Sequence, residues 1–130
     1  MSPNSPQESA SLTPSLAEAL YHHAVDGLAA GDLPTAIAGF RASLGADPEY
    51  VDSAHGLIHA LKDAGQLDEA VTTARKLIAA HPDDVLAHTS LSILYQRQGK
   101  IPEAEAAATR AKLLGWKKQL RDQKDAESRA

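Results

Sequence analysis

A 34-residue internal repeat constrains this chain more than any other feature of its sequence. Three consecutive blocks, residues 17–50, 51–84 and 85–118, align without a gap. A recurring unit of roughly 20–50 residues cannot bury its apolar face alone, and stacking on its neighbours completes the core. The repeat therefore predicts a stack of similar units, not a sandwich or an α/β enzyme core.

Each block carries the same small and helix-breaking residues at the same positions. A glycine ends the first helical run, where a left-handed residue is needed, and an alanine follows where two helices cross. In the first two blocks a proline then closes the second helix. These columns are Gly31, Gly65 and Gly99; Ala36, Ala70 and Ala104; and Pro48 and Pro82. They predict one helix pair per block, with helices at about 15–30, 34–45, 51–64, 68–80, 85–98 and 102–114.

Four polar residues stand where a helix is expected to begin. Their side chains can accept a hydrogen bond from a backbone N–H of the first turn, which otherwise has no partner. The predicted caps are Ser15, Asp32, Asp68 and Asp84.

The two ends of the chain differ from the repeats in composition. Residues 1–14 are rich in Ser and Pro and are expected to be disordered. A seventh, polar helix is expected over about residues 117–127, with Trp116 and Leu120 laid over the last helix pair as a cap. The predicted organisation is a disordered segment at 1–14, three repeats over 15–118, and a capping helix with its tail over 117–130.

The columns of Gly, Ala and Pro, together with Phe40 at the bulky position of the first block, resemble the tetratricopeptide repeat family. The resemblance covers residues 17–118 and is to short, stand-alone bacterial-type members. It departs from the family pattern at Ala74 and Ala108, which replace the bulky residue, and at Trp116, which replaces the closing proline. The resemblance implies an all-α, right-handed α-solenoid of three helix pairs plus a C-terminal capping helix.

The same resemblance implies a concave groove lined by the first helix of each pair. Steps of three and four along a helix place the family's groove positions on one face. Tyr21, Val25 and Ile93 are the apolar members that would dock a peptide or a helix, or that would pack against a neighbouring helix instead. The predicted groove residues are Glu18, Tyr21, Val25, Leu28, Asp52, His55, His59, Lys62, Asp63, Thr89, Ile93, Gln96 and Arg97.

Histidines supply a second candidate site. His55, His59 and Asp63 are spaced four apart on one helix face, and imidazole with carboxylate is a set that binds divalent metals. The alternative is that these side chains make polar contacts to a bound peptide. His23 and His88 occupy positions that face the interior of a helix pair, and we expect them to be buried and hydrogen-bonded.

Composition excludes several classes of function. The formal net charge of −4 does not provide the basic surface that nucleic acid requires. The chain has no cysteine, and no apolar run approaches the ~20 residues of a membrane span. It also lacks a nucleophile elbow and a phosphate-binding loop, so no enzyme activity and no cofactor are expected. Without a secretory signal at the N-terminus, a cytoplasmic location is expected.

The leading hypothesis is a protein–protein interaction module, an adaptor or scaffold that binds a peptide or helix of a protein partner in its groove. One alternative is a structural scaffold that forms homo-oligomers by stacking repeats between chains near Trp116. The other alternative is a metal-binding sensor or enzyme that uses the groove histidines.

Overall fold

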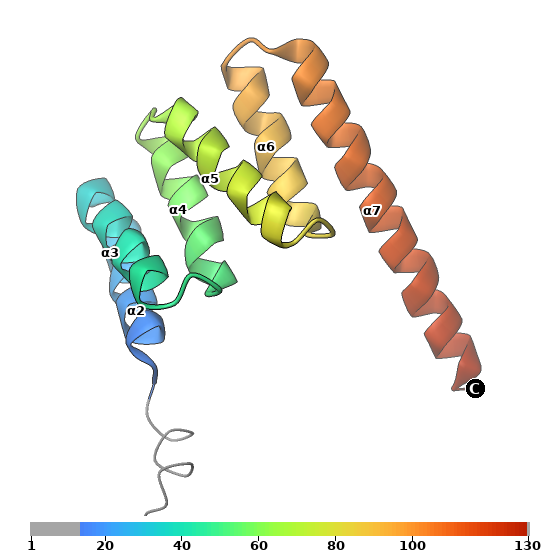
Figure 1. Ribbon diagram of the computed structural model, residues 1–130, viewed down its shortest axis with the longest axis horizontal. Coiled ribbons are helices and arrows are strands. Elements are labelled where there is room, and N and C mark those ends of the chain that lie inside the picture. Colours follow the sequence, from blue (N-terminus) through green and yellow to red (C-terminus); the bar gives the residue numbers. More distant parts are fainter. Residues whose placement is uncertain (1–13, 130) are drawn as a thin grey trace, which may run out of the picture. The chain divides into compact units, whose positions relative to one another are not determined.

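The computed structural model describes residues 14–129, and this part of the chain is all-α (Figure 1). Six helices and no strand occur within it, which confirms the predicted fold class. The expected disordered segment, residues 1–14, lies outside the described residues except for Pro14. The helices are α2 (Leu16–Ala29), α3 (Leu33–Ala46), α4 (Val51–Asp63), α5 (Leu67–Ala80), α6 (Val85–Arg97) and α7 (Ile101–Ser128).

The helices belong to two compact units. The N-terminal unit, Met1–Ala64, contains α2, α3 and α4, and the C-terminal unit, Gly65–Ala130, contains α5, α6 and α7. Within the N-terminal unit α3 packs on both α2 and α4, and within the C-terminal unit α6 packs on both α5 and α7. In the N-terminal unit α2 and α4 also contact each other, so all three helices pack together, whereas in the C-terminal unit α6 is the helix that contacts both others.

Three of the four predicted helix caps are confirmed. Ser15 Oγ accepts a hydrogen bond from the Glu18 N–H at 3.1 Å. Asp32 Oδ1 accepts from the Thr35 N–H at 3.2 Å, and Asp84 Oδ1 accepts from the Ala87 N–H at 3.0 Å. Each side chain satisfies a donor that has no partner within its own helix.

The prediction that Asp68 caps α5 is wrong. The residue directly after the turn glycine takes the N-cap position, and in the second block that residue is Gln66. Asp68 lies instead inside the first turn of α5, where its Oδ1 accepts a hydrogen bond from Gln98 Nε2 at 2.7 Å. It therefore ties the start of α5 to the end of α6.

The glycine column behaves as predicted. Gly31, Gly65 and Gly99 all have φ of +76°, and no other residue of the described chain has a positive φ. A Cβ in this left-handed conformation meets the following carbonyl, so only glycine adopts it at little cost. Within the two units, Gly31 reverses the chain between α2 and α3, and Gly99 reverses it between α6 and α7.

Small residues allow α2 and α3 to approach closely. An added Cβ on Gly39 would stand only 2.7 Å from the Cβ of Ala24, and one on Gly27 would stand 3.2 Å from the backbone nitrogen of Ala36. Ala24 and Ala36 are both fully buried. The alanine column therefore marks a real helix crossing in the first block.

Hydroxyl groups join the three helices of the N-terminal unit. Ser43 Oγ donates to the Ala17 carbonyl oxygen at 2.7 Å, and Ser53 Oγ donates to Ser43 Oγ at 2.6 Å. Both serines are fully buried, and the bonds connect α2, α3 and α4. In the C-terminal unit Ser92 Oγ makes the equivalent bond to the Ala104 carbonyl oxygen at 2.8 Å.

The last helix differs from its predicted limits. The sequence predicts separate helices at 102–114 and 117–127, whereas α7 is one helix of 28 residues. Trp116 stands where proline closes the earlier pairs, and Gly115 keeps a negative φ, so no residue interrupts the helix. Trp116 and Leu120, expected to cover the last pair, are 61% and 55% exposed. The stacking of repeats also predicts that the apolar residues Ile101 and Leu113 belong to the core of the last repeat. They are 50% and 52% exposed, so that prediction is wrong.

Candidate protein-binding faces

The N-terminal unit places nine of the predicted groove residues on α2 and α4, two helices in direct contact. None of the nine is buried, although the same helices bury Ala17, Ala24, Leu57 and Leu61 on their other sides. Helical spacing puts the nine on the outward sides of the two helices. We call this surface the α2–α4 face, and its residues are Glu18, Tyr21, Val25, Leu28, Asp52, His55, His59, Lys62 and Asp63.

Tyr21 is the aromatic residue of the α2–α4 face, and Tyr50 borders the face beside it. The Tyr21 ring centroid lies 5.6 Å from that of Tyr50 and 5.9 Å from that of Phe40. Tyr21 is half-buried, so one part of its side chain packs against neighbouring residues and the other part is exposed. Val25 is exposed. Tyr50 was not predicted as a site residue. Its signal in the sequence is its place directly before α4, where a large side chain reaches back toward the preceding helix pair.

The surroundings of Tyr50 are acidic. Desolvation, together with the negative charges of Glu18 and Asp52, raises the pKa of the Tyr50 phenol above its ordinary value. Residues 14–64 carry seven Asp or Glu and two Lys or Arg, a formal charge of −5. Three Asp or Glu and one Lys of that set lie on the face itself, so it favours cationic groups, and the rings of Tyr21 and the neighbouring Tyr50 can also receive a cation.

The candidate metal site is not formed. His59 Nε2 lies 3.3 Å from Asp63 Oδ2, but His55 is eight residues from Asp63, which is ~12 Å along a helix. Metal ligands lie ~2 Å from one ion, so these three side chains do not reach a common centre. No group of three or more His, Cys, Asp or Glu in residues 14–129 is arranged to hold a metal. The spacing alone could have shown this.

In the C-terminal unit the other four predicted groove residues lie on α6 and are all exposed. They are Thr89, Ile93, Gln96 and Arg97. Leu86, seven residues before Ile93 and on the same side of the helix, is 56% exposed and was missed. Leu86 is the second residue of its block, as Glu18 and Asp52 are of theirs. The repeat alignment could therefore have identified Leu86 as a groove residue.

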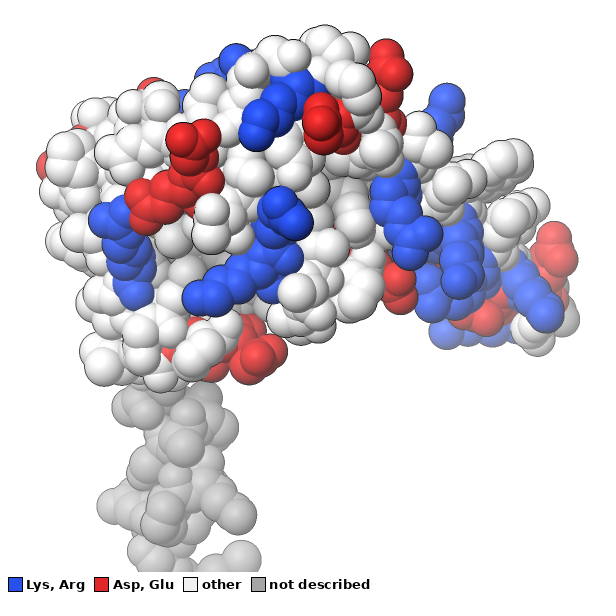
Figure 2. All heavy atoms as spheres, turned by 45° about the horizontal axis from the view of Figure 1, so that its top comes forward, with Lys and Arg blue, Asp and Glu red and all other residues white. Residues whose placement is uncertain are grey.

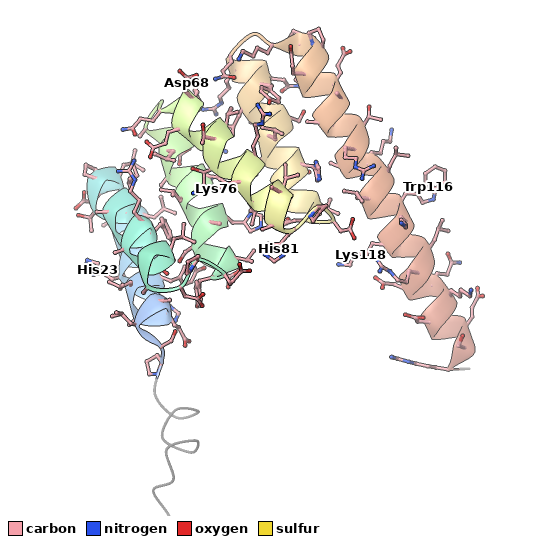
Figure 3. The ribbon with its side chains drawn as sticks, viewed as in Figure 1. His23, Asp68, Lys76, His81, Trp116 and Lys118 are labelled. Atoms are coloured by element: carbon pink, nitrogen blue, oxygen red, sulfur yellow. The ribbon has the colours of Figure 1, made fainter. Side chains whose placement is uncertain are left out.

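The opposite side of α6 borders an open cavity of about 420 Å³ between α5, α6 and α7. One of its lining residues is His88, which is buried and whose Nε2 lies 2.9 Å from the Pro82 carbonyl oxygen, as predicted. The matching prediction for His23 is wrong, because that side chain is exposed (Figure 3). The cavity residues are Arg75, Ile78, Ala79, His88, Leu91, Tyr95, Glu103, Ala106 and Ala107.

Comparison with known families connects this architecture to a named one. The family model described as tetratricopeptide repeat matches residues 27–94, which is more than half of the 130-residue chain. The chain belongs to the tetratricopeptide repeat family. This family supports a role in protein–protein interaction. No helix within residues 14–129 is long and apolar enough to cross a membrane.

Solved structures similar to this tetratricopeptide repeat chain include several of MamA. A crystal structure of MamA has a TM-score of 0.77 at 22% sequence identity and covers 87% of this chain and 66% of that one. A second MamA structure has a TM-score of 0.75 at 22% identity, covering 87% and 62%, and one described as MamA MSR-1 has 0.73 at 18%, covering 86% and 64%. The chain thus spans slightly less than two thirds of these proteins, and at such identities the likeness shows the fold alone. Comparison with curated proteins finds no match.

Proposed function

We propose that this protein is a non-enzymatic adaptor or scaffold that binds a segment of a partner protein on the α2–α4 face. The observation that supports the proposal most is that none of the nine residues of the face is buried. The face combines exposed Val25 and half-buried Tyr21 with charged groups, the mixture that a bound peptide or helix needs for apolar anchoring and polar registration.

Charge indicates what kind of segment fits. Glu18, Asp52 and Asp63 carry three negative charges on the face, against the single positive charge of Lys62. A segment with apolar side chains and several Lys or Arg would gain electrostatic attraction as well as apolar contact. The exposed side of α6, with Leu86, Ile93 and Arg97, is a second candidate surface in the C-terminal unit, and it carries apolar residues and a positive charge without the acidic residues of the α2–α4 face.

The proposal keeps the sequence-based organisation. Three repeats, at 17–50, 51–84 and 85–118, form the interaction domain, and residues 117–130 end it. A cytoplasmic location is part of the same proposal.

Peptide selection tests the proposal. Peptides are selected from a random library on the immobilised chain, and their affinity is measured by fluorescence anisotropy. Asp52→Lys combined with His59→Ala should weaken binding about tenfold, the equivalent of about 1.4 kcal/mol. The control is His23→Ala, because His23 is exposed but lies two residues after Tyr21 and so on another side of α2. Binding that the double variant leaves unchanged contradicts the proposal.

A further inference from the structure

An uncovered apolar stripe runs along the C-terminal half of α7. Leu113, Trp116 and Leu120 are more than half exposed, and their spacing of three and four residues places them on one side of the helix. Ala104, Ala107, Ala111 and Leu114 are the buried residues of α7, and the same spacing puts them on the opposite side. Figure 3 shows Trp116 pointing away from α6 and Lys118 pointing to the other side of the helix. We call Leu113, Trp116 and Leu120 the α7 stripe.

The helix also extends beyond its support. An added Cβ on Gly115 would lie 3.9 Å from Val85 Cγ1, so Gly115 stands level with the first residue of α6. Residues 116–128 continue past that point, ~20 Å of helix at the rise of an α-helix (Figure 1). This segment is long enough to dock on the surface of another protein chain.

The charge around the stripe is strongly positive. Residues 110–124 contain six Lys or Arg and one Asp, a formal charge of +5. Lys117, Arg121 and Lys124 follow helical spacing along one flank of the stripe, and Figure 2 shows Lys and Arg side chains gathered over α7. Pairing two α7 stripes would bring like charges together, which is unfavourable. The occupant of the stripe should therefore be acidic.

An acidic surface of the right kind exists on the same chain. The α2–α4 face carries three Asp or Glu and one Lys, a formal charge of −2, against +5 for residues 110–124. On this face Glu18 and Asp52 lie close enough to Tyr50 to raise the pKa of its phenol. These carboxylates can pair with Lys117 and Lys124, while Val25 and Tyr21 offer apolar contact to Trp116.

We propose that α7 of one copy of this chain docks on the α2–α4 face of a second copy. The proposal rests on the proposed function, because it names the segment that the face binds. The contact joins two different surfaces, so each pair of docked copies keeps one unused stripe and one unused face, and association can continue beyond a dimer. A helix of ~20 Å buries an area at the low end of specific interfaces, so the dissociation constant should be roughly 10–100 µM.

Sedimentation velocity of the full chain tests association. Between about 5 and 500 µM the weight-average sedimentation coefficient should rise, and raising the salt from about 0.05 to 0.5 M should reduce the rise. The variant K117E/K124E should stay monomeric over this range. The control K76E/K118E changes the net charge equally at two exposed residues away from the stripe, and it should associate like the wild type.

A charge exchange identifies both surfaces. The variant E18K/D52K should also stay monomeric alone, with thermal melts confirming that both variants fold. Mixed in equal amounts, E18K/D52K and K117E/K124E should associate again, because each reversed surface meets its complement on the other chain. A wild type that is monomeric at every concentration, equal effects of K76E/K118E and K117E/K124E, or a mixture that stays monomeric would each overturn the proposal.

Two further measurements distinguish the docking of α7 from the alternative explanations. A labelled peptide of residues 108–128 should bind the full-length K117E/K124E variant, whose α2–α4 face is unchanged. The peptide should fail to bind a variant that carries E18K and D52K in addition to K117E and K124E. If library peptides bind the α2–α4 face but this peptide does not, the proposed function stands and the docking of α7 is wrong. If the monomeric wild type binds phosphatidylglycerol vesicles through Lys117 and Lys124 and does not self-associate, the stripe belongs to an anionic membrane and the docking proposal is overturned.

Discussion

The ring of Phe40 lies directly on the backbone of Gly56, so that any Cβ at position 56 would overlap three of its ring carbons. Phe40 is 1% exposed and is the largest fully buried side chain of the described chain. The glycine therefore creates the space into which the ring of α3 packs against α4. This contact explains a glycine in the middle of a helix, where the residue otherwise weakens the structure.

Gly56→Ala should destabilise the protein by about 1–3 kcal/mol, because the methyl group forces the Phe40 ring or the two helices to move. Urea unfolding followed by circular dichroism measures the change. Gly45→Ala is the matched control in α3, where an added Cβ meets nothing within 4 Å, and it should be neutral or stabilise by up to about 1 kcal/mol. Equal destabilisation by both variants would contradict the packing argument.

Ser43→Ala should cost about 1–3 kcal/mol, because it leaves the buried Ala17 carbonyl oxygen and the Ser53 hydroxyl without their hydrogen-bond partner. The same unfolding measurement applies. Thr72→Ala removes a hydroxyl whose hydrogen bond to the Asp68 carbonyl oxygen is exposed, and it should change the stability by less than about 0.5 kcal/mol. A neutral Ser43→Ala would show that water or a neighbouring donor replaces the serine.

The glycine and alanine columns were predictive because each has a local physical cause. A left-handed turn needs glycine at Gly31 and Gly99, and a helix crossing needs a small residue at Ala36, whatever the rest of the chain does. The limit of α7 was missed because a seventh helix was placed by analogy, although Trp116 in place of proline already allowed the helix to continue. Leu113 and Ile101 are predicted in the core because they are apolar, and periodicity does not reveal that no helix within residues 14–129 covers them.

The candidate site was less predictable than the fold. Repeat positions placed residues such as Asp52 and His59 on an unburied helix side, but they did not indicate Tyr50, which reaches the face from a helix boundary. The histidine pattern misled because a shared helix face is not a shared ligand centre. His55 and Asp63 lie two turns apart, whereas His59 Nε2 lies 3.3 Å from Asp63 Oδ2.

Gly115→Ala should stabilise the protein by up to about 1 kcal/mol, because Gly115 lies inside α7 and an added Cβ would make only an ordinary contact with Val85. The mean helicity measured by circular dichroism should rise or stay equal. Gly99→Ala is the control with the opposite sign. Gly99 has φ of +76°, so its alanine variant should lose roughly 1–2 kcal/mol. A helix that broke at residue 115 would instead make Gly115→Ala destabilising.

The cap formed by Asp32 should make stability depend on pH in the acid range. Hydrogen bonds from the Thr35 hydroxyl, at 2.6 Å, and from the Thr35 N–H hold the pKa of Asp32 below its ordinary value of 3.8. A carboxyl group with a lowered folded-state pKa stabilises the fold at pH values above its unfolded-state pKa. That contribution is lost as the pH falls through the folded-state pKa. The melting temperature of the wild type should therefore fall more steeply below pH ~4 than that of Asp32→Ala. Asp83→Ala removes an exposed carboxylate just before α6 and controls for the change in net charge. Parallel acid profiles for the wild type and Asp32→Ala would show that the cap does not contribute to acid sensitivity.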